Sequence, residues 1–148
     1  MTPGFLRVIV VSAALLAGSG CMSVYKLPAG APSTTIQLPG GVVPWICARS
    51  EPQRLMSGKD GKAVIPVGER IVIGANLAYS DGYMNYYCSA SASFVPTADH
   101  DYQQDFVTEG NYCSSLVYRM APDDKRIGLA FEPTLNSGNK ACGFRKGR

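Results

Sequence analysis

The residues from Met84 to Val95 show the clearest alternation of apolar and polar side chains in the sequence. One face would carry Met84, Tyr86, Cys88, Ala90, Ala92 and Phe94, and the other mainly hydroxyl and amide side chains. Because successive side chains of a β-strand point to opposite faces, this period of two predicts a strand. We therefore expect Cys88 and the alanines to face a core, with Phe94 filling its far end.

Similar short segments, rich in β-branched and aromatic residues, occupy much of the remaining sequence. The predicted strands are Thr34 to Leu38, Val42 to Arg49, Lys62 to Val67, Arg70 to Tyr79, Met84 to Val95, Tyr102 to Thr108, Tyr112 to Met120 and Ile127 to Phe131. Turn signals such as Ser80-Asp81-Gly82 separate them, and no segment has helical periodicity. This pattern fits an antiparallel sandwich or a small barrel, and we predict an all-β sandwich of about seven or eight short strands.

The beginning of the chain has the pattern of a signal peptide. Arg7 precedes the uncharged ten-residue run Val8 to Ala17, which is too short to span a bilayer, and small residues lead from there to Cys21. This pattern resembles the lipobox of bacterial lipoproteins, with Gly18 where a Leu is usual. The resemblance implies that Cys21 carries lipid and is the first residue of the mature chain. The alternative is a secreted protein in which Cys21 is a plain thiol.

The cysteine count supports acylation of Cys21. The chain has five cysteines, and acylation of one leaves an even set, namely Cys47, Cys88, Cys113 and Cys142. Two disulfides are expected in an oxidising compartment, and the sequence allows three pairings. We favour Cys88 with Cys113, and Cys47 with Cys142.

These features divide the chain into three parts. Residues 1–20 would be the signal peptide, residues 21–32 a lipid-anchored tether, and residues 33–148 a single domain. The tether contains Pro, Gly and Ala with little apolar periodicity, so we expect a flexible segment that reaches roughly 20 Å. The resemblance to lipoproteins of Gram-negative bacteria places the protein at the periplasmic face of the outer membrane rather than the inner, because Met22 replaces the Asp of the inner-membrane retention signal.

Charge and histidine content argue against several classes of function. The 14 Lys and Arg residues against 11 Asp and Glu are no nucleic-acid-binding signature. His100 is the only histidine, and Asp99, Asp101 and Asp105 lie close to it in sequence. One imidazole with paired cysteines does not make a transition-metal site, so we predict no metal or cofactor and interpret this segment as a polar turn.

Motifs of known catalytic centres are also missing from the sequence. There is no Gly-X-Ser-X-Gly elbow, no phosphate-binding glycine loop and no Cys-X-X-Cys pair, and disulfide sulfurs are no nucleophiles. We therefore predict that the protein is not an enzyme. A hydrolase that uses His100 is the weakest alternative.

The densest aromatic group of the sequence is Tyr79, Tyr83, Tyr86 and Tyr87. Alternation places Tyr86 on the face of Cys88, and Tyr83 and Tyr87 on the opposite face. Tyr83 and Tyr87 are therefore the candidate contact surface, while the alternative for the group is core and cross-strand packing. Trp45 shares a face with Cys47, and we expect it in the core.

A longer stretch resembles a family of uncharacterised Gram-negative lipoproteins. The residues concerned are Val64-Ile65-Pro66-Val67-Gly68-Glu69-Arg70-Ile71-Val72-Ile73, Cys88, Phe94-Val95-Pro96, Tyr102 and Cys113. These proteins carry a β-sandwich similar to PEGA and carboxypeptidase-regulatory domains, and the likeness covers Thr34 to Met120 without the PEGA tetrapeptide itself. It implies a non-enzymatic envelope module and transfers no functional residue.

Besides the hydrolase, the sequence thus leads to one main functional hypothesis and one alternative. The main hypothesis is a membrane-anchored periplasmic lipoprotein that serves as a structural or protein-interaction module of the envelope, with a protein partner and with lipid on Cys21. The alternative is an inhibitor of lysozyme or of a protease, because such inhibitors are often small, disulfide-bonded β lipoproteins. The Ser-Gly-X-X-Tyr stretch of the lysozyme-inhibitor family is missing from this sequence.

Overall fold

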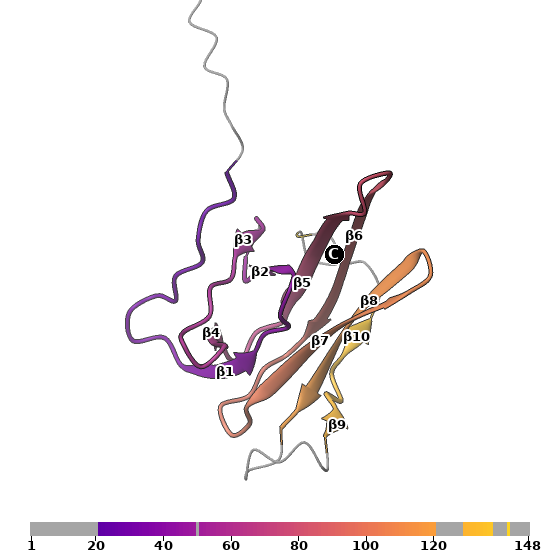
Figure 1. Cartoon of the computed structure of the whole chain (residues 1–148). Helices are drawn as coiled ribbons and strands as arrows, with labels where there is room; N and C mark the ends of the chain where they lie inside the picture. The colour runs from indigo at the N-terminus through magenta and orange to yellow at the C-terminus, as the bar shows by residue number, and fades with distance from the viewer. Residues whose placement is uncertain (1–20, 50, 121–128, 138–141, 143–148) are drawn as a thin grey trace, which may run out of the picture.

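The chain folds into two packed β-sheets, as Figure 1 shows for the computed structural model, which describes residues 21–49, 51–120, 129–137 and 142. One five-stranded sheet has the order β4-β1-β7-β8-β9 and the other the order β10-β6-β5-β2-β3. The strands are β1 (Ser33–Gln37), β2 (Val43–Cys47), β3 (Gln53–Arg54), β4 (Lys62–Pro66), β5 (Ile71–Ser80), β6 (Asn85–Phe94), β7 (Tyr102–Glu109), β8 (Tyr112–Arg119), β9 (Ala130–Phe131) and β10 (Asn136–Ser137). The predicted all-β, disulfide-braced sandwich is confirmed.

The sequence pattern located seven of the strands to within two residues at each end. For the eighth, only Ala130 and Phe131 are described as strand, and residues 127–128 lie outside the described residues. Strands β3 and β10 were not predicted. Each has only two residues, which is too short to show a period.

Most neighbouring strands run antiparallel, and β5 with β6 form the longest pairing, from Ile71 opposite Phe94 to Ser80 opposite Asn85. Strands β1 and β7 are parallel, with Ile36 opposite Tyr102. This parallel pair joins the antiparallel β1–β4 pair and the β7–β8 hairpin into one sheet.

The main core lies between the two sheets and is rich in isoleucine. Its buried residues are Ile36, Ile46, Leu55, Ala63, Ile65, Ile71, Ile73, Phe94, Tyr102 and Val117. The rings of Phe94 and Tyr102 meet from opposite sheets with centroids 5.1 Å apart. The prediction that Phe94 fills the end of the core is confirmed.

A second, smaller cluster lies on the outer face of the β10-β6-β5-β2-β3 sheet. Trp45 is only 9% exposed and packs there with Cys47 and Val72, beside the partly buried Cys142. Trp45 is opposite Gly74, where an added Cβ would lie 2.3 Å from the indole Cζ2. Trp45 and Cys47 are thus buried together as predicted, but outside the main core, and only a glycine at position 74 leaves room for the indole.

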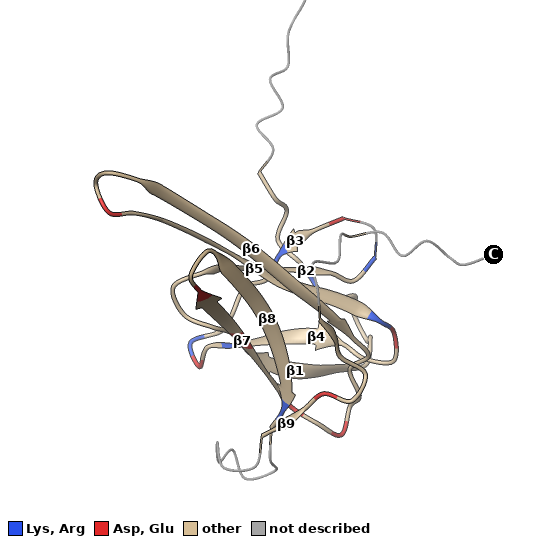
Figure 2. Ribbon diagram, turned by 90° about the vertical axis from the view of Figure 1, so that its right-hand side faces the viewer, with Lys and Arg blue, Asp and Glu red and all other residues tan. Residues whose placement is uncertain are grey.

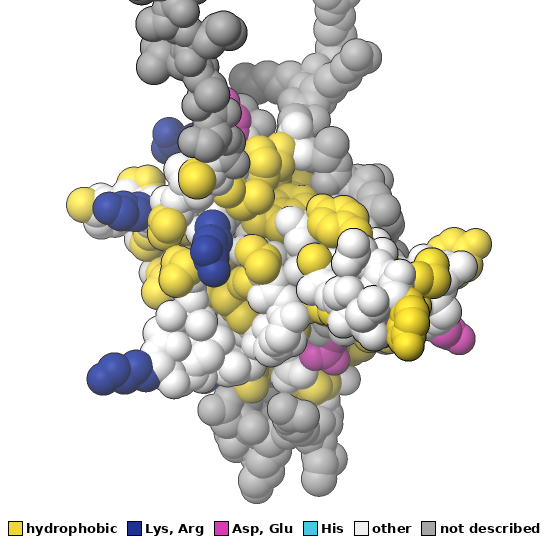
Figure 3. Space-filling view, turned by 45° about the horizontal axis from the view of Figure 1, so that its top comes forward, with side chains coloured by type: hydrophobic (Ala, Val, Ile, Leu, Met, Phe, Trp, Pro, Cys, Tyr) yellow, Lys and Arg dark blue, Asp and Glu magenta, His cyan; other side chains and the backbone are white. Residues whose placement is uncertain are grey.

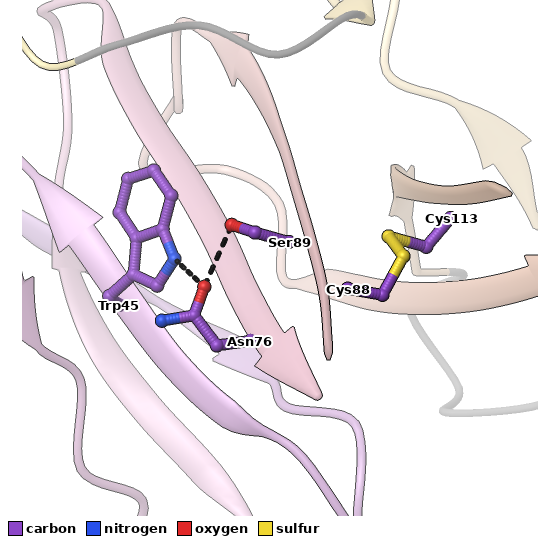
Figure 4. The surroundings of a disulfide bond; sticks show 5 residues. All are labelled: Trp45, Asn76, Cys88, Ser89 and Cys113. Carbon is purple, nitrogen blue, oxygen red and sulfur yellow. Dashed lines mark hydrogen bonds between the residues drawn. A yellow bond between two sulfur atoms is a disulfide. The ribbon is translucent and has the colours of Figure 1, made fainter. Parts of the chain in front are cut away.

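A polar network continues this cluster along the outer face (Figure 4). The indole Nε1 of Trp45 donates a hydrogen bond to Asn76 Oδ1 at 3.3 Å, and Ser89 Oγ donates to the same oxygen at 2.8 Å. Strands β2, β5 and β6 each contribute one of these side chains. The network therefore links three neighbouring strands, just below the exposed end of the β5–β6 hairpin.

A buried carboxylate holds the segment that follows β9. Arg119 Nε donates to Glu132 Oε2 at 2.6 Å, and the backbone N and Oγ1 of Thr134 donate to Oε1 at 3.0 and 2.7 Å. Burial alone would raise the pKa of Glu132, but the hydrogen bonds from Thr134 and Arg119 outweigh it and lower the pKa. Glu132 is therefore ionised at neutral pH and fixes this segment against β8.

The expected free tether differs from the observed structure near its beginning. Arg54 N donates to the carbonyl of Ser23 at 2.7 Å, and Tyr25 N donates to the carbonyl of Arg54 at 2.9 Å. Val24 thereby forms a parallel bridge with Arg54, and Tyr25 packs against the main core. Residues 23–25 are therefore bound to the sheet edge instead of moving as a random coil.

Candidate functional site

The hairpin of β5 and β6 projects beyond the packed body of the sandwich, as Figures 1 and 2 show. Burial falls steadily along β5, from Ile71 to Ala75 inside to Tyr79 and Ser80 outside, and β6 mirrors this change. From Ile71 to Phe94, Asp81 is the only charged residue. The projecting end is therefore nearly uncharged although it is exposed to solvent.

Asp81 organises the turn at the end of this hairpin. Its Oδ1 accepts hydrogen bonds from the backbone N of Tyr83 at 2.9 Å and of Met84 at 2.8 Å. Gly82 adopts a φ of 92°, which favours glycine. The hydrogen bonds from Met84, Tyr83 and Tyr86 lower the pKa of Asp81, so the turn is held by a carboxylate at neutral pH.

Two tyrosines on the inner face of the hairpin form a stacked pair. Tyr79 and Tyr86 lie opposite each other in the register, with ring centroids 4.6 Å apart and ring planes 12° apart. Tyr86 Oη donates to Asp81 Oδ2 at 3.0 Å, and this hydrogen bond raises the pKa of Tyr86. The stack and the turn therefore support each other and order the tip of the hairpin.

A disulfide fastens this hairpin to the other sheet (Figure 4). Cys88 of β6 and Cys113 of β8 are bonded, with their Cα atoms 6.2 Å apart. The second predicted pair, Cys47 with Cys142, is also present. The alternation of β6 had placed Cys88 on the inner face, and the structure shows that Cys113 faces it across the sandwich. The crosslink lies where burial is falling, so it holds the two hairpins together where little core remains.

A cavity of about 320 Å³ lies between the ends of the two hairpins, above this disulfide. Its lining residues are Leu77, Tyr79, Asn85, Tyr86, Tyr87, Cys88, Thr108, Gly110, Asn111 and Tyr112. None of these residues is charged, and aromatic, amide and hydroxyl groups predominate. The arrangement suits contact with a neutral, partly apolar surface.

The predicted contact residues are both exposed at this end. Tyr83 is 98% exposed in the turn, and Tyr87 is 71% exposed on the face opposite to Cys88. The structure adds Tyr112, which is 82% exposed at the start of β8, and Met84. One sign of Tyr112 is present in the sequence, because it directly follows Gly110 and Asn111, two residue types that favour turns. We call Tyr79, Tyr83, Met84, Tyr87 and Tyr112 the hairpin end.

The residues around His100 are placed away from the hairpin end, in the turn before β7. His100 Nε2 lies 3.5 Å from Asp99 Oδ2, while Thr34 Oγ1 donates to the backbone carbonyl of His100 and not to its ring. Asp101 accepts a hydrogen bond from Thr35 Oγ1 at 2.7 Å. These contacts fasten the turn to β1, in agreement with a structural role.

Asp105 lies on β7, where it accepts a hydrogen bond from Gln103 Nε2 at 2.7 Å. Among the residues that the structure describes, no three His, Cys, Asp or Glu side chains come together as metal ligands.

None of the described residues forms a helix long and apolar enough to cross a membrane. The chain matches no protein-family model, no curated protein and no solved structure. The functional assignment therefore depends on the residues themselves.

Proposed function

We propose that this protein is a lipid-anchored, non-catalytic module of the bacterial envelope that binds a protein partner through its hairpin end. The observation that carries the proposal is the gathering of four exposed tyrosines and one methionine at the ends of the β5–β6 and β7–β8 hairpins, where Asp81 and Glu109 are the charged residues. Clusters of exposed aromatic side chains on otherwise polar proteins are typical of binding surfaces. The proposed partner is an envelope protein with a neutral, partly apolar surface.

Rigidity of the hairpin end favours recognition. The Asp81 turn, the stack of Tyr79 on Tyr86 and the disulfide from Cys88 to Cys113 fix its backbone at three points. A surface that is ordered before binding loses less conformational entropy when the partner arrives. Tyrosine also gives a large contact area with few rotatable bonds.

The proposed anchor rests on the sequence of residues 1–21. The signal-peptide pattern ends at Cys21, which is exposed and unpaired, whereas the other four cysteines are in disulfides. We propose acylation of Cys21 and attachment to the periplasmic face of the outer membrane. Two or three acyl chains make such attachment stable, because each buried methylene adds about 0.8 kcal/mol.

The anchor is tested by the intact mass of the mature protein from its native host, after thiol alkylation with and without reduction. We expect a chain that begins at an acylated Cys21 and has four cysteines that react only after reduction. An unacylated chain that begins elsewhere, or thiols that react before reduction, would refute the anchored form.

The contact surface is tested by photo-crosslinking in cells. A photoreactive phenylalanine analogue at position 83 or 87 should crosslink to one specific envelope protein, whereas the analogue at position 131, at the opposite end of the sandwich, should not. Equal crosslinking from the three positions would refute a dedicated hairpin end. If the protein recovered is lysozyme or a protease, an inhibition assay with the purified chain decides for the inhibitor alternative.

A further inference from the structure

The edge of the sandwich next to Cys21 is fixed in place. Ser23 and Tyr25 are hydrogen-bonded to β3 through Arg54, and Gln53 Nε2 donates to Ser23 Oγ at 3.2 Å. Only Met22 lies between Cys21 and this bonded segment. Two extended residues span at most about 7 Å, so lipid on Cys21 would bring the edge at β3 directly to the membrane surface.

The side chains around this edge combine apolar and cationic groups. Met22 and Val24 are exposed hydrophobic residues, and Lys26, Arg49 and Arg54 are exposed cations. Figure 3, which brings the top of Figure 1 forward, shows dark blue Lys and Arg side chains among yellow hydrophobic ones on this face. From residue 21 to residue 56 the sequence has a single acidic residue, Glu51. We call these five side chains, Met22, Val24, Lys26, Arg49 and Arg54, the anchor face.

A hollow beside the same edge has the chemistry of a lipid headgroup site. The cavity has a volume of about 380 Å³, and Lys26 and Arg49 line it together with one acid, Glu69. The other lining residues are Tyr25, Pro28, Ala31, Pro32, Ala48, Gln53, Pro66, Val67 and Ile71. The two cations suit a phospholipid phosphate, and the mainly apolar lining suits the glycerol backbone.

We infer that the anchor face lies flat on the membrane and binds the headgroups of anionic phospholipids. The inference rests on the proposed acylation of Cys21, and it adds the orientation of the sandwich and the class of lipid. Cations are attracted to an anionic membrane surface within about one Debye length of it. The distance from Cys21 to β3 is shorter than this length, so lipid on Cys21 would bring the cations of the anchor face within range. Contact through this face would hold the sandwich in one orientation relative to the membrane.

The test uses the acylated protein from its native host, reconstituted into phosphatidylglycerol vesicles that contain a phospholipid with a photoreactive headgroup. The deciding readout is labelling of residues 51–54, which are distant from Cys21 in sequence but adjacent to it in the structure. We expect these residues to be labelled and residues 129–137 not. In phosphatidylcholine vesicles, or at about 1 M salt, labelling of residues 51–54 should fall at least threefold.

Two variants sharpen the result. Arg54→Glu should lower labelling of residues 51–54 at least threefold in anionic vesicles. Lys59→Glu makes the same change of charge in the turn between β3 and β4, outside the anchor face, and should leave labelling unchanged. Labelling that is independent of lipid charge, or that falls equally in both variants, would overturn the inference.

Vesicle flotation and intact mass separate this inference from the proposed anchor. A protein that lacks lipid on Cys21 and does not float with vesicles would refute both. A protein that is acylated and floats, but is not labelled at residues 51–54, would refute the anchor face alone and leave the anchor intact.

Discussion

The two ends of the β5–β6 hairpin use aromatic side chains in opposite ways. At the body end, Phe94 packs against Tyr102 and both rings are fully buried. At the hairpin end, Tyr79 stacks on Tyr86, yet Tyr79 remains more than half exposed. Phe94 and Tyr86 both lie on the inner face of β6, because they share the same alternation. The difference shows that periodicity determines which face a residue occupies, while a covering second layer determines whether that face is buried.

The largest predicted difference is in the loss of stability when one aromatic ring is removed from each end. Phe94→Ala should lower the free energy of unfolding by about 3–5 kcal/mol, because it leaves a cavity in the main core. Tyr79→Ala should cost at most about 1 kcal/mol, since its ring is half solvated and its stacking energy is small. Urea denaturation followed by circular dichroism measures both, and equal losses would remove the distinction between the two ends.

The disulfide between Cys88 and Cys113 should replace part of the missing core at the hairpin end. Changing both cysteines to alanine should lower the free energy of unfolding by about 3 kcal/mol, because the crosslink closes a loop across 25 positions. Amide hydrogen exchange should accelerate in residues 77–88 and 108–115 and remain slow around Phe94. Uniform acceleration over the whole domain would contradict a local role.

The buried carboxylate of Glu132 should stabilise the folded domain at the body end. Glu132→Gln should cost about 2–3 kcal/mol, because Arg119 and Thr134 lose a charged acceptor. The folded-state pKa of Glu132 is lowered, so its contribution is fully present above the ordinary glutamate pKa of about 4.3 and is lost as the pH falls further through the folded value. A wild-type stability advantage over Glu132→Gln that persists unchanged at low pH would refute this account.

Gly74 should tolerate no larger side chain, because Trp45 lies on it. Gly74→Ala places a Cβ 2.3 Å from the indole and 2.8 Å from the carbonyl oxygen of Ala90, and should cost about 1–3 kcal/mol. The fluorescence of Trp45, the only tryptophan, should shift to longer wavelength as the ring is displaced. Gly110→Ala is the matched control, since no atom lies within 4 Å of an added Cβ there and strain at its φ of 57° is the only cost expected.

Much of the fold could be predicted from local pattern. The period of two in β6 gave both the strand and the inward face of Cys88, and turn residues such as Ser80-Asp81-Gly82 gave its boundary. Four cysteines allow three pairings, and the structure contains the favoured one. These features depend on neighbours in sequence or on simple counting.

The rest depends on contacts between segments that are distant in sequence. Strand β10 exists because Asn136 pairs with Ser93, and residues 23–25 are ordered because β3 binds them. The ion pair of Arg119 with Glu132 likewise depends on how β8 meets the segment that follows β9. No period or motif in the sequence carries this information.

The most direct test of the central claim compares stability with partner binding for the double variant Tyr83→Ala with Tyr87→Ala. Because both side chains are exposed, the free energy of unfolding should change by less than about 0.5 kcal/mol. Capture of the crosslinked envelope partner from the native host should fall at least tenfold relative to wild type. Unchanged capture by the stable double variant would contradict a hairpin end that binds the partner.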